Sequence, residues 1–264
     1  MYPDLENQGH IIVGGSSGIG LATAEILAAN KARVAIISRD EATSLAAELS
    51  KKYNTLVTSI VGDATAKSSI ENAIQCAAEE LEDIKGLVTC NAERPRHTSD
   101  FLDSSDDDWQ ASFDSLVMGT VRCCRAVIPY LKDSSGGSIV TLGAYSIRSP
   151  KPYLFPYAAS KAAIANLTKN LAKCYGDRGI RANCVCPGVT ETGRSQTRLD
   201  DLTATRGISR EEAAKVTIEN LGMSVALQRL GKPSEVAEAI AFLLSERSSY
   251  ISGALLNIDG GTDF

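Results

Sequence analysis

Two polar residues one helical turn apart, Tyr157 and Lys161, have the spacing of an acid–base pair. In the segment YAASK they occupy positions i and i+4, which share one face of a helix. An ammonium group beside a phenol stabilises the phenolate and lowers a pKa that starts near ~10. The pair therefore predicts a tyrosine that can donate or accept a proton near neutral pH.

A second group of candidate residues is the glycine-rich segment IIVGGSSGIG, which contains Gly15, Gly18 and Gly20. It follows an apolar run that predicts a strand, and it opens a segment that predicts a helix. Glycines at such a junction allow a tight turn and a close approach of the backbone to a pyrophosphate, while the free N–H groups of the helix attract phosphate. The segment therefore predicts a dinucleotide-binding loop.

The elements that would position these residues alternate along the chain. The β-rich runs are HIIVG, RVAIIS, TLVTSIV, GLVTC, SIVTLG, IRANCVC and ALLNID. Helix-length segments separate them, including one long segment at 107–131. Strands that alternate with helices of this length predict βαβ units and a mostly parallel sheet covered on both faces.

Residues 192–230 depart from this alternation. They are polar, charged and helix-prone, and they follow a predicted strand and the pair Pro187-Gly188. Long insertions in compact domains are often functional, so we interpret this region as a lid over the carboxyl edge of the sheet. The alternative is a solvated surface excursion.

Composition and charge argue against several classes of protein. A chain of 264 residues fits one large α/β domain as well as it fits two small ones, and a net charge of −5 gives no basic surface for nucleic acid. No window approaches about 18 uninterrupted apolar residues, so no membrane span is predicted. The N-terminal segment MYPDLENQGH lacks the features of a signal peptide. We therefore expect a cytoplasmic protein without a nucleic-acid or membrane partner.

The residues that most often bind metals lack ligand spacing. Seven cysteines occur without a Cys-x-x-Cys motif, and the two histidines lie far apart in the sequence. This pattern predicts free, partly buried thiols rather than disulfides, and no metal site.

Several motifs in order along the chain resemble the short-chain dehydrogenase/reductase family. They are Gly-x-x-x-Gly-Ile-Gly, Asn91-Ala92, Tyr157-x-x-x-Lys161, Asn183 in RANCVCPG and NIDGG, and the match runs from about residue 10 to 261. The resemblance implies a single α/β domain over residues 1–264, with a Rossmann-type, doubly wound, seven-stranded parallel sheet. It also implies an oxidoreductase acting on a small molecule, with Tyr157 and Lys161 as catalytic residues. Members are usually homotetramers or homodimers, so the resemblance implies one of these assemblies.

By the same resemblance, the expected cofactor is NADP(H). Members that prefer NAD carry an acidic residue where this chain has Ser38, and Arg39 beside it suits a 2′-phosphate. Asp63 should meet the adenine, and Val189 and Thr192 should lie near the nicotinamide carboxamide and the phosphates. The expected cofactor-binding residues are Gly15, Ser17, Gly18, Ile19, Gly20, Ser38, Arg39, Asp63, Asn91, Tyr157, Lys161, Val189 and Thr192.

The substrate side departs from the family pattern. The family has Ser thirteen positions before the Tyr and Asn on the long helix, where this chain has Ala144 and Leu116. Removal of a donor to a developing oxyanion typically costs ~10²–10³ in kcat. Tyr145 and Ser146 are nearby hydroxyls, and in an extended segment Ser146 would point as residue 144 does. Ser146 is therefore our first hypothesis for a replacement donor.

A changed substrate is the other explanation, because reduction of an iminium carbon develops no oxyanion. Conjugate reduction of an enone also moves the charge away from the carbonyl carbon. Charged residues expected near the mouth of the site favour a polar or ionised substrate; they are Glu93, Arg94, Arg96, His97 and Arg148. Glu93 is of particular interest because it replaces a Gly next to the expected nicotinamide position.

These observations favour an NADP(H)-dependent reductase that transfers hydride to a small-molecule carbonyl, enone or imine. One alternative is a non-redox isomerase, cyclase or dehydratase that retains NADP structurally and uses Tyr157 and Glu93 for acid–base chemistry. Another is a pseudoenzyme that senses NADP(H). An altered site in a standard scaffold suggests specialised metabolism.

Overall fold

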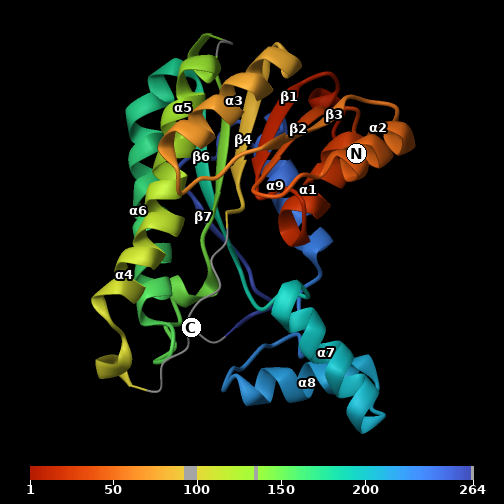
Figure 1. Cartoon of the computed structure of the whole chain (residues 1–264), viewed down its shortest axis with the longest axis vertical. Coiled ribbons are helices and arrows are strands. Elements are labelled where there is room, and N and C mark those ends of the chain that lie inside the picture. The colour runs from red at the N-terminus through yellow and green to blue at the C-terminus, as the bar shows by residue number, and fades with distance from the viewer. Residues whose placement is uncertain (92–99, 134–135, 263–264) are drawn as a thin grey trace.

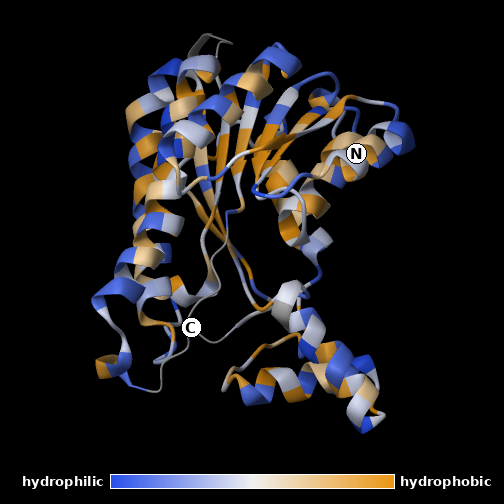
Figure 2. Cartoon of the chain, in the orientation of Figure 1, coloured by the Kyte–Doolittle hydropathy of each residue, from blue (hydrophilic) through white to orange (hydrophobic). Residues whose placement is uncertain are grey.

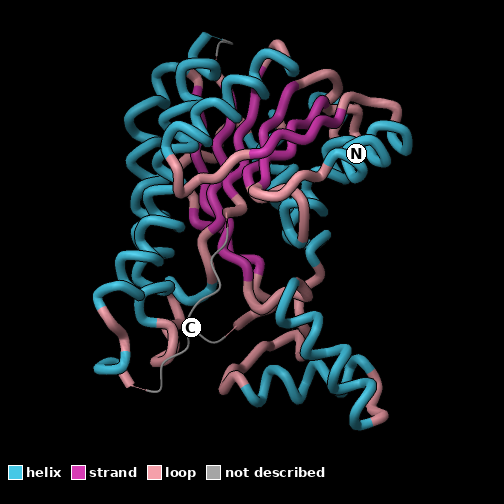
Figure 3. Tube along the Cα trace, viewed as in Figure 1, coloured by secondary structure: helices cyan, strands magenta, loops and turns pink. Residues whose placement is uncertain are grey.

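The computed structural model describes residues 1–91, 100–133 and 136–262, and its centre is one sheet of seven parallel strands (Figures 1 and 3). The strands are β1 (Gly9–Val13), β2 (Arg33–Ser38), β3 (Val57–Val61), β4 (Ile84–Thr89), β5 (Gly137–Leu142), β6 (Ile180–Pro187) and β7 (Leu255–Ile258). Their order is β3-β2-β1-β4-β5-β6-β7, and every neighbouring pair is parallel. The carboxyl ends of all strands therefore meet at one edge.

Helices cover both faces of this sheet (Figure 1). One layer contains α1 (Gly18–Ala29), α2 (Thr43–Tyr53) and α9 (Pro233–Leu244), and the other contains α3 (Lys67–Leu81), α5 (Gly119–Asp133) and α6 (Phe155–Tyr175). The predicted doubly wound parallel sheet is confirmed, since each predicted β-rich run overlaps one of its strands.

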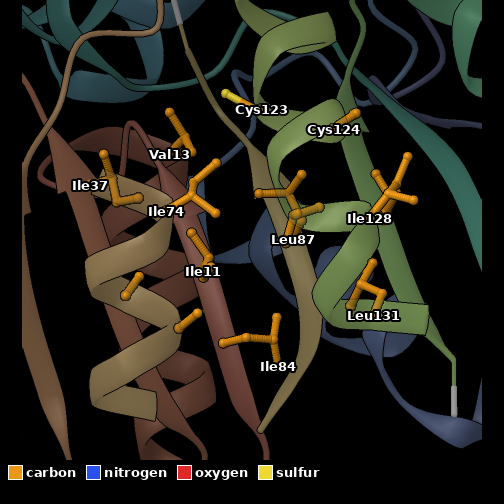
Figure 4. Close-up of a cluster of buried hydrophobic side chains, with 14 of the residues drawn as sticks. Ile11, Val13, Ile37, Ile74, Ile84, Leu87, Cys123, Cys124, Ile128 and Leu131 are labelled. Carbon is orange, nitrogen blue, oxygen red and sulfur yellow. The ribbon is translucent and has the colours of Figure 1, made fainter. Parts of the chain in front are cut away.

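Alternating side chains of each strand supply the two cores. Ile11 and Val13 of β1 pack against α3 and α5 in one buried cluster, which Figure 4 shows, while Ile12 packs against the opposite helix layer. This period of two follows from strand geometry. Figure 2 shows hydrophobic residues concentrated in the strands and on the inward sides of the helices. Because both faces of the sheet are covered, its runs barely alternate in polarity.

The segment at 107–131 is not one regular helix. It comprises α4 (Asp106–Ser112), a π-helical turn (Phe113–Met118) and α5. The Ser105 hydroxyl accepts the Asp108 N–H, and the Asp108 carboxylate accepts the Ser105 N–H, so a capping box begins α4. π-helical turns often mark functional sites.

The region predicted to be a lid forms two helices, α7 (Gly193–Arg206) and α8 (Arg210–Asn220), at one end of the molecule beyond β6 and β7 (Figure 1). They enclose a small core of their own, made by Leu199, Ala213, Ala214, Ile218, Met223, Val225 and Leu230. The chain then returns to the main body, where the backbone N–H groups of Ala226 and Leu227 donate to the carbonyls of Gly261 and Gly260. Across the described residues, no helix is both long and apolar enough to cross a membrane.

Candidate functional site

The turn after β1 packs so closely that side chains are excluded at two of its glycines. Gly14 has φ of +79°, and a Cβ there would lie 2.7 Å from the Cys90 carbonyl oxygen. A Cβ on Gly20 would lie 2.2 Å from the Gly14 carbonyl oxygen. The sequence reading named Gly15, Gly18 and Gly20 and missed Gly14, although Gly14 lies four residues before Gly18 and so begins the Gly-x-x-x-Gly-Ile-Gly motif.

The first turn of α1 is open to an anion. Ser17 at its N-cap makes no side-chain capping bond, and the first turn holds no acidic residue. The unsatisfied N–H groups and the positive end of the helix dipole therefore favour phosphate at this position. Thr192 lies against the same loop, because a Cβ on Gly18 would be 3.1 Å from the Thr192 Cγ2 atom. The close turn and the uncapped helix fit the pyrophosphate of a dinucleotide.

The residues expected at the adenosine end lie together at the carboxyl ends of β2 and β3. The Ser38 hydroxyl is buried and donates to the Asp40 carbonyl at 2.7 Å, while Arg39 is exposed. The Asp63 Oδ1 atom accepts both the N–H and the hydroxyl of Thr65 at 2.8 Å. The Thr65 N–H is the main cause that lowers the pKa of Asp63, and the Arg39 charge contributes. Arg39 is therefore close enough to Asp63 to act on it electrostatically.

The predicted acid–base pair comes together on α6. Lys161 is 3% exposed, and its Nζ donates to the Leu142 carbonyl at the end of β5, at 2.7 Å. The same Nζ lies 5.6 Å from the centroid of the Tyr157 ring. A cation held at this distance stabilises a phenolate, so the geometry provides for proton transfer by Tyr157.

A cavity of about 720 Å³ joins this pair to the glycine loop. Its lining includes Ile19 and Asn91 on the expected cofactor side, and Val189 and Thr192 after β6. The remaining residues come from the end of β5, the start of α6 and the predicted lid; they include Ala144, Tyr145, Tyr153, Leu154, Tyr157, Lys161, Ser195, Thr197 and Leu221. One cavity thus extends from Ile19 of the glycine loop to the Tyr157–Lys161 pair.

An apolar residue occupies the π-helical turn behind the pair. Leu116 is fully buried, and it clusters with Ile164 and with the half-buried Tyr157. Its carbonyl accepts the Thr120 hydroxyl at 2.8 Å, and the neighbouring Ser115 carbonyl accepts the Asn91 amide at 2.9 Å. Position 116 therefore packs against α6 and has no polar side chain.

The structure does not place Ser146 beside Ala144. The backbone is extended at Ala144, with φ of −162°, but Tyr145–Ile147 form a 3₁₀ turn, so the alternation expected of an extended segment ends there. Ser146 lines a separate cavity of about 490 Å³ with Phe155 and other residues of α6. Its buried hydroxyl has no hydrogen-bond partner among the described residues. Tyr145, in contrast, lines the same cavity as Ala144.

Of the charged residues expected at the mouth of the site, only Arg148 lies in the described part of the chain. Glu93, Arg94, Arg96 and His97 lie outside the described residues. Arg148 is exposed and does not line the cavity. Lys161 is the only Lys, Arg, Asp or Glu in the described part of the lining.

The thiols of Cys184 and Cys186 lie against Gly143, just after β5, which the sequence did not predict. The sulfurs of Cys184 and Cys186 lie 3.9 Å apart on β6, and a Cβ on Gly143 would be 2.8 and 2.9 Å from them. Both are buried, and the hydrogen bond with the Cys186 thiol is the main cause that lowers the pKa of Cys184. The described residues contain no group of three or more His, Cys, Asp or Glu side chains that could hold a metal.

Residues 13–263 match the family model described as enoyl-(acyl carrier protein) reductase. Among proteins of similar sequence is dehydrogenase/reductase SDR family member 4 of Bos taurus, which is 30% identical over 260 residues. The match covers 98% of this chain and 88% of that protein.

Two solved structures have the same fold over nearly their whole length. L-Sorbose reductase from Gluconobacter frateurii, complexed with NADPH and L-sorbose, superposes with a TM-score of 0.90 at 27% identity, covering 99% of this chain and 98% of that one. An NADPH-bound short-chain oxidoreductase from Pseudomonas aeruginosa PAO1, described as containing an atypical catalytic center, gives 0.87 at 27% identity, with coverage of 98% and 97%.

Proposed function

The chain belongs to the short-chain dehydrogenase/reductase family, and on that premise we propose that it is an NADP(H)-dependent reductase of a small-molecule carbonyl, enone or imine. One observation carries the proposal. A single cavity joins Ile19 of the glycine loop to the Tyr157–Lys161 pair. Such a cavity suits an enzyme that must hold a dinucleotide and protonate a substrate beside it.

The preference for NADP(H) rests on the end of β2. Ser38 brings no carboxylate that would repel a 2′-phosphate, and the exposed guanidinium of Arg39 can bind one through two hydrogen bonds. Two relatives of known structure, the sorbose reductase and the Pseudomonas oxidoreductase, were determined with NADPH. When bound, the cofactor supplies the hydride.

The chain's own contribution to the chemistry is proton transfer. Tyr157 donates its proton to the substrate atom that gains electron density, and the Lys161 ammonium stabilises the phenolate that remains. The bond from Lys161 to the Leu142 carbonyl holds the ammonium in position before the substrate arrives. Ala144 and Leu116 give the site a non-standard set of catalytic positions: the cavity wall has no hydroxyl at position 144, and the buried residue 116 behind Tyr157 has no amide side chain.

The proposal is tested by following the loss of NADPH absorbance with a panel of ketones, quinones, enones and cyclic imines. We expect the wild type to oxidise NADPH with at least one carbonyl compound. Tyr157→Phe should reduce that rate ~10²–10⁴-fold, because it removes the general acid and keeps the ring. Tyr175→Phe is the matched control, since Tyr175 ends the same helix away from the cavity.

Binding of NADPH, measured by its fluorescence, separates two kinds of failure. A wild type that binds NADPH and oxidises it with no member of the panel would contradict the reductase and favour a non-redox reaction. Imine reduction that survives in Tyr157→Phe would show that the substrate needs no proton from this residue.

A further inference from the structure

The π-helical turn (Phe113–Met118) is joined to the cofactor side of the cavity through one of its backbone carbonyls. The Gly119 N–H donates to the Asp114 carbonyl, five residues back. In a regular α-helix it would donate four residues back, to Ser115. The Ser115 carbonyl instead accepts the side-chain amide of Asn91, which lines the cavity, at 2.9 Å. The register of the turn therefore joins it to the segment after β4.

A second connection runs from α5 to the segment after β3. The Arg122 guanidinium donates from Nη1 to the Ala64 carbonyl at 3.1 Å and from Nη2 to the Asp114 Oδ1 atom at 2.7 Å. The Arg122 side chain is 16% exposed, so water screens this ion pair less than it screens a pair at the surface. Arg122 thus holds one residue of the π-helical turn and one residue next to Asp63.

The π-helical turn also explains why Arg122 and Asp114 meet. Residues eight apart in a regular α-helix lie about 80° from each other around the axis, away from one shared face. The extra residue of a π-helical turn reduces this offset to about 20°, so both side chains leave the same face. Long side chains on a helix also lean toward its N-terminus, which brings the Arg122 guanidinium back toward Asp114.

The start of α5 packs closely against both of these segments. A Cβ on Gly119 would lie 3.0 Å from the Asn91 Nδ2 atom and 3.3 Å from the Ala64 Cβ atom. Ala64 is buried and belongs to the core that also contains Cys123 of α5. A displacement of the start of α5 would therefore move the segments after β3 and β4 as well.

Residues 63–65, which we name the adenine loop, follow β3 beside the end of β2. In doubly wound folds the end of the second strand binds the adenosine ribose, and the ligand lies outside the carboxyl ends of the strands, so the adenine is expected at this loop. The Thr65 N–H is the main cause that lowers the pKa of Asp63, and the charges of Arg39 and Arg122 contribute. The Arg122 charge therefore acts on the carboxylate of the loop, while its guanidinium binds the loop's backbone.

We propose that Arg122 is a positioning residue that holds the adenine loop against the π-helical turn and so sets the affinity for the adenosine half of the cofactor. The inference rests on the dinucleotide cofactor of the function proposed above. Arg122 is not among the residues that line the cavity around Tyr157. It acts through the loop, and not on the nicotinamide half of the cofactor or on the substrate.

Calorimetric titration with separate parts of the cofactor tests this. 2′,5′-ADP contains adenine and the 2′-phosphate, 5′-ADP contains adenine without that phosphate, and reduced nicotinamide mononucleotide contains neither. Arg122→Met keeps the aliphatic stem and removes every donor, so it should weaken the binding of both adenine ligands about tenfold. Binding of the mononucleotide should stay within about twofold of the wild type, which a general loss of structure would not allow.

Arg125→Met is the matched control, because Arg125 is exposed on the same helix and its substitution removes the same charge. It should bind all three ligands as the wild type does. Asp114→Asn is a milder variant that removes the charge of the partner and keeps its shape, and it should weaken both adenine ligands about threefold. The double variant should bind them no more weakly than Arg122→Met alone, because the two residues act as one unit.

Wild-type affinity for the adenine ligands in both Arg122→Met and Asp114→Asn would overturn the inference and leave the reductase function in place. An equal loss of affinity for the mononucleotide would also overturn it. If Arg122→Met fails to fold, Asp114→Asn decides between these outcomes. A wild type that binds neither NADPH nor the adenine ligands overturns the cofactor assignment itself, and the inference with it.

Discussion

The residues at the adenosine end of the site and those around Tyr157 differ in their exposure to solvent. At the adenosine end, the Thr65 N–H is the main cause that lowers the pKa of Asp63, the nearby Arg39 charge adds to it, and an exposed cation there can bind a phosphate. At the chemical end, Lys161 is buried and held to Leu142, so its charge acts on Tyr157 with little screening by solvent.

Arg39→Ala should raise the KM for NADPH about tenfold and leave the KM for NADH nearly unchanged. The lost interaction is a charge-assisted hydrogen bond to the 2′-phosphate, which NADH lacks, and exposure of Arg39 to solvent keeps the effect modest. Steady-state kinetics with both cofactors checks this. Ser38→Asp provides the complementary variant, since its carboxylate should disfavour NADPH and favour NADH. Equal losses with both cofactors would mean that Arg39 does not contact the 2′-phosphate.

At the scale of elements, the predicted lid is tied across the cavity. Tyr153, just before α6, donates to the carbonyl of Leu221 at the end of α8, and Lys151 donates to the carbonyl of Gly222 at 3.3 Å. Tyr153 and Leu221 both line the cavity. These bonds join segments about 70 residues apart in the chain, so they close one side of the space in which substrate would bind.

Tyr153→Phe should loosen this connection while keeping the ring. The loss of one hydrogen bond of about 1 kcal/mol should raise the KM for substrate about fivefold and increase hydrogen exchange at the amides of residues 221–223. Thr203→Ala is the control, because its hydroxyl donates to the Asp200 carbonyl within α7. If exchange in this segment is the same in Tyr153→Phe and the wild type, the hydrogen bond does not hold the lid.

At the scale of the whole molecule, the sheet contains one buried titratable group that opposes folding in acid. His10 of β1 is fully buried, and neither ring nitrogen has a hydrogen-bond partner among the described residues. A Cβ on Gly86 of the neighbouring strand would lie 2.3 Å from the His10 Nδ1 atom, so the ring fills its space tightly. Burial lowers the pKa of His10 from 6.5 to about 4.

The unfolded chain therefore binds a proton at His10 more readily than the folded chain does. Above pH 6.5 His10 is neutral in both states and does not reduce the free energy of unfolding. As the pH falls from 6.5 toward about 4, protonation of His10 in the unfolded chain lowers that free energy by up to about 3 kcal/mol. His10→Leu should show a smaller loss between pH 7.5 and 5 than the wild type, as measured by urea unfolding. Parallel pH profiles of the two proteins would contradict this account.

Assembly and location are also properties of the whole molecule, and both stay predictions. The resemblance implies a homotetramer or homodimer, and apolar segments of α5 and α6, RCCRAVIPYL and IANLTKNLAKCY, are candidates for the contact. The cytoplasmic location rests on the sequence alone.

The sequence by itself determined the elements and the local pair. Seven apolar runs became seven strands because strands buried on both faces require continuous apolar sequence. Tyr157 and Lys161 came together because residues i and i+4 share a helix face whatever surrounds the helix. The glycine motif was found from its position between a predicted strand and a predicted helix. Gly14 was identified as a residue of the turn only from its φ and its close approach to Cys90.

Only the tertiary structure decided which neighbours these local elements have. A 3₁₀ turn after Ala144 sent Ser146 into one cavity and left Tyr145 in the other. Tyr153 met Leu221, and the two thiols of β6 came to lie beneath Gly143. These contacts join segments tens of residues apart or depend on how a loop leaves a strand. Periodicity and spacing report only on residues within one element, whereas the packing of several elements sets such contacts.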